Sequence, residues 1–154
     1  MTEAALALAV NDVIDGFTVI RVLDTKQPSR TFLVRRSLNA EDIVLKLSRP
    51  ESREAEVLQQ VSHSGVCQLL GQGGDSANPY LLLSNYGQRT LQNCVEQGIA
   101  IKTLADVLLQ IAAALDALHA SGFAHGDVRP EHILVTPNQQ AVLIDLHCAY
   151  HLAG

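Results

Sequence analysis

The side chains best suited to chemistry lie in residues 125–134, which read His-Gly-Asp-Val-Arg-Pro-Glu-His-Ile-Leu. Asp145 stands eighteen residues after Asp127, directly behind the apolar run Ala-Val-Leu-Ile at 141–144. A carboxylate can accept a proton from a hydroxyl group, and it can also hold a hard cation such as Mg²⁺. The two aspartates, one in a loop and one at the end of a short strand, are therefore a candidate catalytic pair.

Two helices are predicted to support this pair. Residues 103–120 form the stronger helix, because apolar residues recur at helical spacing and Gly122 stands just past the end. Its expected apolar face consists of Leu104, Val107, Leu108, Ile111, Leu115 and Leu118. Residues 51–62 form a shorter helix, in which Ala55, Leu58 and Val61 follow the same periodicity.

Several short strands are predicted from runs of β-branched and apolar residues bounded by turn residues. The expected strands are 17–23, 31–35, 42–47, 67–70 and 80–83, followed by a last hairpin of 135–137 and 141–145. The glycine-rich residues 71–75 are expected to form a turn. This order of elements, five strands with one helix after the third, predicts an α+β fold.

The element order, the His125-Gly126-Asp127 triplet and Asp145 together resemble the protein-kinase-like superfamily. The resemblance implies a five-stranded antiparallel amino-terminal lobe with one helix (1–83), a hinge (84–88) and a much reduced carboxy-terminal lobe (89–154). The sequence stops nine residues after Asp145. We therefore expect a truncated carboxy-terminal lobe whose exposed face is covered by a protein partner or by a second copy of the chain.

The resemblance assigns catalytic roles by position. Asp127 would accept the proton of the attacking hydroxyl, and Asp145 would hold Mg²⁺. Lys46, within Ile-Val-Leu-Lys, would hold the α- and β-phosphates of ATP. The alternative for Lys46 is an edge-strand lysine whose ammonium reaches water. Arg129 replaces the usual lysine of the loop and would neutralise a phosphate oxygen as a planar fork.

The remaining nucleotide-binding residues follow from the same resemblance. Glu54, with Glu56 as the alternative, would pair with Lys46, and Leu83 would be the gatekeeper. Ser84 and Tyr86 would belong to the hinge that hydrogen-bonds the adenine edge. Leu134 would support the adenine ring from below.

Several positions depart from the family pattern. Asp24, Lys26 and Ser29 stand where the family has the three glycines of its phosphate loop. His132 occupies the place of the metal-binding asparagine. Because imidazole is a softer ligand than an amide oxygen, the expectation is either that one metal ion is lost or that a softer ion such as Mn²⁺ is favoured. Gly126 replaces an arginine. His147 replaces the glycine that follows Asp145 by two residues.

Two functions are therefore predicted. The first is an atypical ATP-dependent kinase that transfers phosphate to a protein or small-molecule hydroxyl. The second is a pseudokinase that acts as a binding or regulatory module. Retention of Lys46, Glu54, Asp127 and Asp145 favours the first, whereas the altered phosphate loop and His132 favour the second.

Amino-acid composition limits the classes of binding partner and the cellular compartment that can be expected. The chain has 154 residues, is 47% hydrophobic and carries a formal net charge of −5, which argues against a general nucleic-acid or anionic membrane surface. No apolar run is long enough to span a membrane. Three cysteines (Cys67, Cys94, Cys148) lack metal or redox spacing and indicate a reduced, cytoplasmic protein. A zinc site at His147, Cys148 and His151 is the weaker alternative to ordinary loop histidines.

Overall fold

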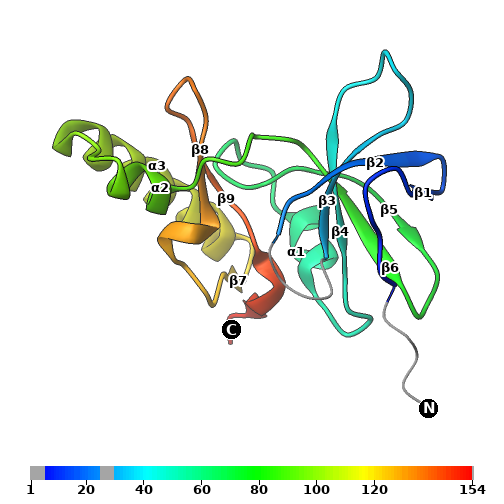
Figure 1. Cartoon of the computed structure of the whole chain (residues 1–154). Helices are drawn as coiled ribbons and strands as arrows, with labels where there is room; N and C mark the ends of the chain where they lie inside the picture. The colour runs from blue at the N-terminus through cyan, green and yellow to red at the C-terminus, as the bar shows by residue number, and fades with distance from the viewer. Residues whose placement is uncertain (1–5, 25–29, 154) are drawn as a thin grey trace. The chain divides into compact units, whose positions relative to one another are not determined.

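The computed structural model describes residues 6–24 and 30–153 (Figure 1). The chain divides into two compact units. The first, called the sheet unit here, comprises Met1–Ser52 and Leu69–Asn85; the second, the loop unit, comprises Arg53–Gln68 and Tyr86–Gly154.

The sheet unit is built on one antiparallel sheet with the strand order β1-β2-β3-β4-β6-β5. Its strands are β1 (Val13–Ile14), β2 (Phe17–Val22), β3 (Thr31–Arg35), β4 (Ile43–Leu47), β5 (Leu69–Gly74) and β6 (Pro79–Leu83). The predicted five-stranded antiparallel sheet is confirmed, and the two-residue strand β1 is an addition to it. β1 joins the sheet by pairing Ile14 with Phe17 in β2.

Alternation of side chains across the strands produces the core of the sheet unit. Val19, Phe32, Val34 and Leu45 are fully buried and belong to one apolar cluster with Phe17, Leu47 and Tyr80. The neighbouring strands β3, β4 and β6 pair through long registers such as Thr31↔Lys46↔Leu81. The core therefore depends on contacts between residues far apart in the sequence.

The predicted turn at 71–75 is wrong for most of its length, because residues 71–74 continue strand β5. Gly73 lies opposite Tyr80 in the pairing of β5 with β6. A Cβ atom at Gly73 would collide with the Tyr80 ring and hydroxyl. Gly73 therefore leaves room for a tyrosine of the neighbouring strand without interrupting its own strand.

The loop unit contains three helices: α1 (Glu54–Gln60), α2 (Leu91–Glu96) and α3 (Ile101–Ala120). Periodicity did not predict helix α2, although the amino-terminal signal of the helix is present in the sequence. Thr90 caps the helix by accepting from the Asn93 N–H, and the Asn93 side chain accepts from the Thr90 N–H. This reciprocal arrangement is a capping box with asparagine in the third position.

Helix α3 confirms the strongest helix prediction, although its buried face is narrower than expected. Val107, Ile111, Ala114 and Leu118 are buried, whereas Leu108 is 50% exposed. None of the described helices is both long and apolar enough to cross a membrane.

Four short strands and two 3₁₀ turns complete the loop unit. They are β7 (Phe123–Ala124), η1 (Pro130–His132), β8 (Ile133–Val135), β9 (Ala141–Leu143), η2 (Leu146–Cys148) and β10 (Tyr150–His151). The predicted last hairpin exists as β8 paired with β9, but its first strand begins two residues earlier than expected. The shift brings Ile133 and Leu134, both buried, into the strand pair. β7 pairs with β10, which brings the segment after Asp145 back to the residues before Asp127.

Candidate active site

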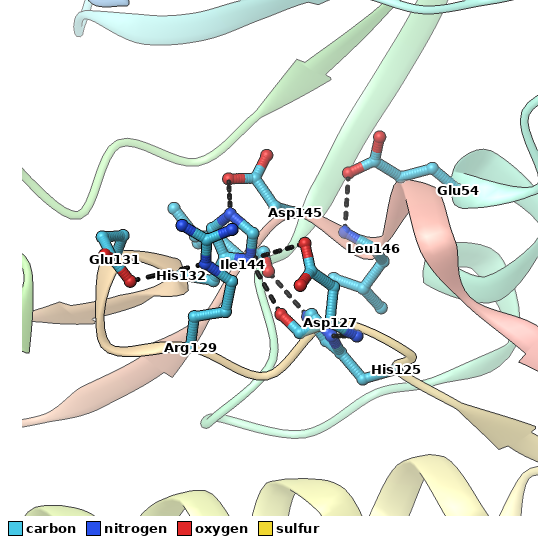
Figure 2. Close-up of polar contacts among 9 residues, drawn as sticks. All are labelled: Glu54, His125, Asp127, Arg129, Glu131, His132, Ile144, Asp145 and Leu146. Carbon is cyan, nitrogen blue, oxygen red and sulfur yellow. Dashed lines mark hydrogen bonds and ion pairs between the residues drawn. The ribbon is translucent and has the colours of Figure 1, made fainter.

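His125 is a buried histidine that fixes the start of the loop carrying Asp127. Its side chain is 1% exposed, its Nε2 lies 2.8 Å from the Ile144 carbonyl oxygen, and its Nδ1 accepts from the Asp127 N–H at 3.1 Å (Figure 2). Because Nδ1 is the acceptor, Nε2 carries the proton and donates. Burial lowers the pKa of His125, more strongly than its hydrogen bond to Ile144 raises it. The neutral ring thus ties residue 127 to the strand that leads to Asp145.

His132 lies between the two aspartates of the predicted catalytic pair. Its Nδ1 is 2.8 Å from the Asp127 carbonyl oxygen and 3.5 Å from the Asp127 Oδ2. Its Nε2 is 3.4 Å from the Asp145 Oδ2 (Figure 2). The two nitrogens of one imidazole therefore face the two carboxylates, and the tertiary structure brings together residues that are eighteen positions apart.

Asp145 has a backbone conformation that few non-glycine residues adopt. Its φ and ψ are 59° and 64°, in the left-handed region. Such a conformation costs roughly 1–2 kcal/mol in an L-residue and persists where the surroundings hold it. The chain enters η2 directly afterwards, and the side chain of Leu146 is fully buried. The conformation turns the chain sharply at the point where Asp145 faces His132.

Glu54 holds this turn from helix α1. Its side chain is 2% exposed, and its Oε1 accepts a hydrogen bond from the Leu146 N–H at 3.2 Å (Figure 2). A buried carboxylate is costly unless polar groups satisfy it. The ion pair of Glu54 with Lys46 stays a prediction, and the contact of Glu54 with Leu146 was not predicted.

Lys46 lies on strand β4, which is flanked by β3 and β6 within the sheet. The alternative that Lys46 belongs to an edge strand is therefore wrong. The residue is half-buried in a strand whose neighbours Val44, Leu45 and Leu47 are buried. Its predicted role at the phosphates remains a prediction.

Arg129 forms an exposed ion pair with Glu131 on the surface of the loop. Its Nε lies 3.5 Å from the Glu131 Oε2, and the two side chains are 53% and 47% exposed. An ion pair this exposed contributes little stability. Arg129 can therefore exchange Glu131 for another anion at small cost, and its predicted contact with a phosphate oxygen is an untested prediction.

Comparison with known proteins identifies the family. The profile described as "Protein kinase domain" matches residues 18–154. The chain belongs to the protein kinase family. Serine/threonine-protein kinase 16 of Mus musculus is 28% identical over 141 residues, which cover 85% of this chain and 45% of that protein. Serine/threonine-protein kinase PknD of Mycobacterium tuberculosis (strain CDC 1551 / Oshkosh) is 41% identical over 75 residues, 49% of this chain and 10% of that protein.

The chain spans less than half the length of these curated relatives. A solved structure titled "PpkA-294 apo form" has a TM-score of 0.79 and 18% sequence identity, and it matches over 92% of this chain and 62% of that one. This likeness supports the protein-kinase-like fold.

The predicted adenine-binding residues of this kinase-family chain lie in both units. In the sheet unit, Leu83 ends β6 and is buried, and Ser84 follows it. In the loop unit, the Tyr86 hydroxyl accepts from the Gln68 N–H at 3.0 Å, and Leu134 in β8 is buried opposite Val142. The division between the units falls between residues 85 and 86, inside the predicted hinge 84–88. Their contact with adenine is still a prediction.

One group of side chains, which includes Asp127, was not predicted from the sequence. Candidate ligand atoms of Asp127, His147 and Cys148 all lie within 4.8 Å of one another. The sequence placed His147 and Cys148 with His151, because the two histidines are four residues apart. Pairing of β7 with β10 was the missing information, since two-residue strands leave no periodic pattern.

Proposed function

We propose that this chain is an atypical kinase that transfers phosphate from ATP to a hydroxyl group. The observation that carries the proposal is the position of His132, whose two nitrogens face the carboxylates of Asp127 and Asp145. A proton-accepting carboxylate beside a metal-holding carboxylate is the arrangement that phosphoryl transfer requires.

Asp127 has the properties of a preorganised proton acceptor. Its backbone N–H donates to His125, and its carbonyl oxygen accepts from the Nδ1–H of His132. The side chain is 30% exposed, so a hydroxyl can approach it. Two hydrogen bonds on the backbone fix the position of residue 127, and fixed geometry is a major part of catalysis when little covalent chemistry is needed.

The donor set fits a divalent cation. Nδ1 of His132 donates to the Asp127 carbonyl, so Nε2, which lies 3.4 Å from the Asp145 Oδ2, is the nitrogen that would hold a cation together with Asp145. A nitrogen and a carboxylate oxygen at this separation suit Mn²⁺ well and Mg²⁺ less well. When bound, the cation supplies charge neutralisation at the phosphate oxygens.

The other nucleotide contacts of the proposal come from the family pattern. Lys46 would hold the α- and β-phosphates, with Glu54 as its partner, and Arg129 would exchange Glu131 for a phosphate oxygen. Leu83, Ser84, Tyr86 and Leu134 would surround the adenine.

A pseudokinase function is the second candidate, and Asp24 favours it. The Asp24 Oδ2 accepts from the Arg30 N–H at 2.9 Å and so bridges the two ends of the β2–β3 connection. An acidic side chain at the position of a family glycine adds negative charge where phosphates would approach. The other two altered positions, Lys26 and Ser29, lie outside the described residues.

A protein partner also remains part of the proposal. On helix α3, Ile101, Leu108 and Leu109 are 86%, 50% and 70% exposed. Exposed apolar side chains on one helix fit the prediction that another chain covers this helix, whether a partner or a second copy.

The test combines nucleotide binding with transfer. We expect Mg²⁺-ATP or Mn²⁺-ATP to raise the melting temperature, since a ligand at 100 times its Kd stabilises by about 2.7 kcal/mol. We expect Asp127→Ala to reduce transfer by roughly 10²–10⁴-fold while this shift persists. Lys46→Ala and Asp145→Ala should each reduce the shift.

Asp116→Ala, on the exposed side of helix α3, is the matched control and should retain both properties. Equal transfer by Asp127→Ala and the control would refute the catalytic assignment. A complete lack of nucleotide-dependent stabilisation would favour the pseudokinase.

A further inference from the structure

Three side chains of different chemical type converge beside the predicted catalytic loop. The carboxylate of Asp127, the imidazole of His147 and the thiol of Cys148 have candidate ligand atoms within 4.8 Å of one another. Asp127 is half-buried, whereas His147 and Cys148 are exposed, so an ion can reach all three from solvent. Among the described residues, this is the one group of three histidine, cysteine and acidic side chains close enough to hold a metal ion.

We propose that Asp127, His147 and Cys148 bind a zinc-type transition metal ion, and that this ion blocks the proton acceptor of the kinase reaction. The binding site stands on the geometry alone. Its inhibitory effect rests on the proposed function, because it requires Asp127 to act as the acceptor.

The ligand chemistry selects the class of metal. Thiolate, imidazole and carboxylate are the three side-chain ligands of Zn²⁺, and three protein ligands with an open fourth position form a common site type. Metal–ligand bonds of about 2.0–2.3 Å place tetrahedral ligands roughly 3.5 Å apart. The three atoms therefore need to close by roughly 1 Å, within reach of two exposed side chains. A thiolate disfavours Mg²⁺, which prefers oxygen ligands.

The fold, rather than a chance rotamer, brings Cys148 to Asp127. Pairing of β10 with β7 places Tyr150 opposite Ala124 and returns the chain to the catalytic loop. Gly126 has a φ of +83°, and a Cβ atom there would collide with the Cys148 carbonyl oxygen. The glycine that replaces the family arginine thus permits the close approach of residue 148.

The neighbouring histidines have other partners. The His151 Nε2 lies 3.0 Å from the Glu56 Oε1, and its ring packs against the Phe123 ring in a tilted arrangement with centroids 4.5 Å apart. The pair of His147 with His151 that the spacing suggested is therefore not the metal-binding pair. His132 lies 6.2 Å from His147 between ring centroids and faces the aspartates.

Binding would change the chemistry of the loop in one step. The Cys148 thiol releases its proton to solvent as the thiolate–metal bond forms. An Asp127 carboxylate oxygen then donates a lone pair to the metal, so it no longer accepts the proton of a hydroxyl. Zinc would therefore inhibit transfer while Mg²⁺ or Mn²⁺ supports it.

The binding test uses the full chain with Co²⁺ as a spectroscopic probe and Zn²⁺ as its competitor. We expect one equivalent of Co²⁺ to produce a thiolate-to-cobalt charge-transfer absorption that Zn²⁺ abolishes. Cys148→Ser should remove this absorption, and His147→Gln and Asp127→Asn should each weaken affinity by at least roughly tenfold. His119→Gln, an exposed histidine at the end of α3, is the control and should bind as the parent chain does.

Charge transfer that persists in Cys148→Ser would overturn the proposal, and so would unchanged affinity in both His147→Gln and Asp127→Asn. Circular dichroism of each variant shows whether it is folded. If His147→Gln does not fold, His147→Ala takes its place.

The activity test adds Zn²⁺ at constant Mg²⁺-ATP. We expect the inhibition constant for Zn²⁺ to rise at least roughly tenfold in Cys148→Ser, each variant being compared with its own zinc-free rate. An unchanged inhibition constant would overturn the regulatory effect. Cobalt binding without any transfer would refute the proposed function and leave the metal site standing, whereas transfer without metal binding would refute the metal site alone.

Discussion

The sheet unit and the loop unit hold their important residues by different interactions. In the sheet unit, Lys46 lies on a strand whose position depends on an apolar cluster with Phe32, Val34 and Leu45 at its centre. In the loop unit, Asp127 and Asp145 are oriented by hydrogen bonds and close polar contacts from histidines and from Glu54. The two charged or polar residues that are buried among the described residues, Glu54 and His125, both belong to the loop unit.

This difference matters because the two kinds of interaction fail differently. Apolar burial is nondirectional, so a core tolerates small shifts but loses stability when volume is removed. Hydrogen bonds are directional, and a buried group left without its partner is costly. Stability should therefore respond most to apolar truncation in the sheet unit, and site geometry to polar or steric changes in the loop unit.

The largest effect is expected in the sheet unit. Leu45→Ala removes a side chain that is fully buried in the core, which should lower the free energy of unfolding by about 2–5 kcal/mol. Urea denaturation measures the change. Leu38→Ala, at a leucine that is 92% exposed in the same unit, should have almost no effect. A similar loss in both variants would contradict the assigned core.

The next effect concerns the close approach of the backbone at residues 126 and 148 in the loop unit. Gly126→Ala should cost roughly 1–2 kcal/mol for the left-handed conformation and roughly 1–3 kcal/mol for the collision with Cys148. Gly122→Ala is the matched control, because Gly122 has a φ of +88° but open space around it. Thermal and urea unfolding of the two variants gives the loss of unfolding free energy in each, and the difference between them is the cost of the collision. Equal losses would show that residue 148 does not pack against residue 126.

A smaller effect is expected from the buried carboxylate. Glu54→Ala leaves the Leu146 N–H without its acceptor and should cost about 1–3 kcal/mol. Glu56→Ala, on the same helix, removes a 42% exposed side chain that contacts His151 and should cost about 0–1 kcal/mol. If the two variants had equal stability, Glu54 would not support the turn after Asp145.

The smallest effect is a pH dependence of the stability of the sheet unit. It comes from Tyr80, which belongs to the apolar core and whose hydroxyl donates a hydrogen bond to Asp15. Burial, and then the hydrogen bond from the Tyr80 hydroxyl to the Asp15 Oδ2 at 2.6 Å, raises the pKa of Tyr80 to about 12. Unfolded tyrosine ionises near 10. The stability that Tyr80 contributes is thus fully present below pH 10 and is lost as the pH rises toward 12.

Phenolate absorbance during a pH titration tests this assignment. In Asp15→Asn the pKa of Tyr80 should fall but stay above 10, because burial is the larger cause of the shift. Asp116→Asn, in the loop unit, should leave the titration unchanged. A Tyr80 that titrates near 10 in the parent chain would contradict both its burial and its hydrogen bond to Asp15.

Much of the fold could be predicted because its signals are local. The strands around Phe17–Val22 and Thr31–Arg35 and the long helix α3 carry periodic patterns that the structure reproduces. Periodicity predicted neither helix α2 nor strands β7 and β10, since these elements are too short to show a periodic pattern. The prediction of a turn at 71–75 was wrong because glycine occurs both in turns and in strands where a neighbouring side chain needs room. Here Gly73 makes room for Tyr80.

The α+β order of elements could be predicted from the sequence, because strand and helix periodicity are local properties of the chain, and the His125-Gly126-Asp127 triplet and Asp145 carried the resemblance to the protein-kinase-like superfamily. Which groups surround the two aspartates depended on tertiary contacts. His132 between the carboxylates, Glu54 on the Leu146 N–H and Cys148 beside Asp127 all depend on pairings between distant segments. Such pairings form when packing of the whole chain outweighs the entropy of closing long loops, and no short stretch of sequence contains that balance.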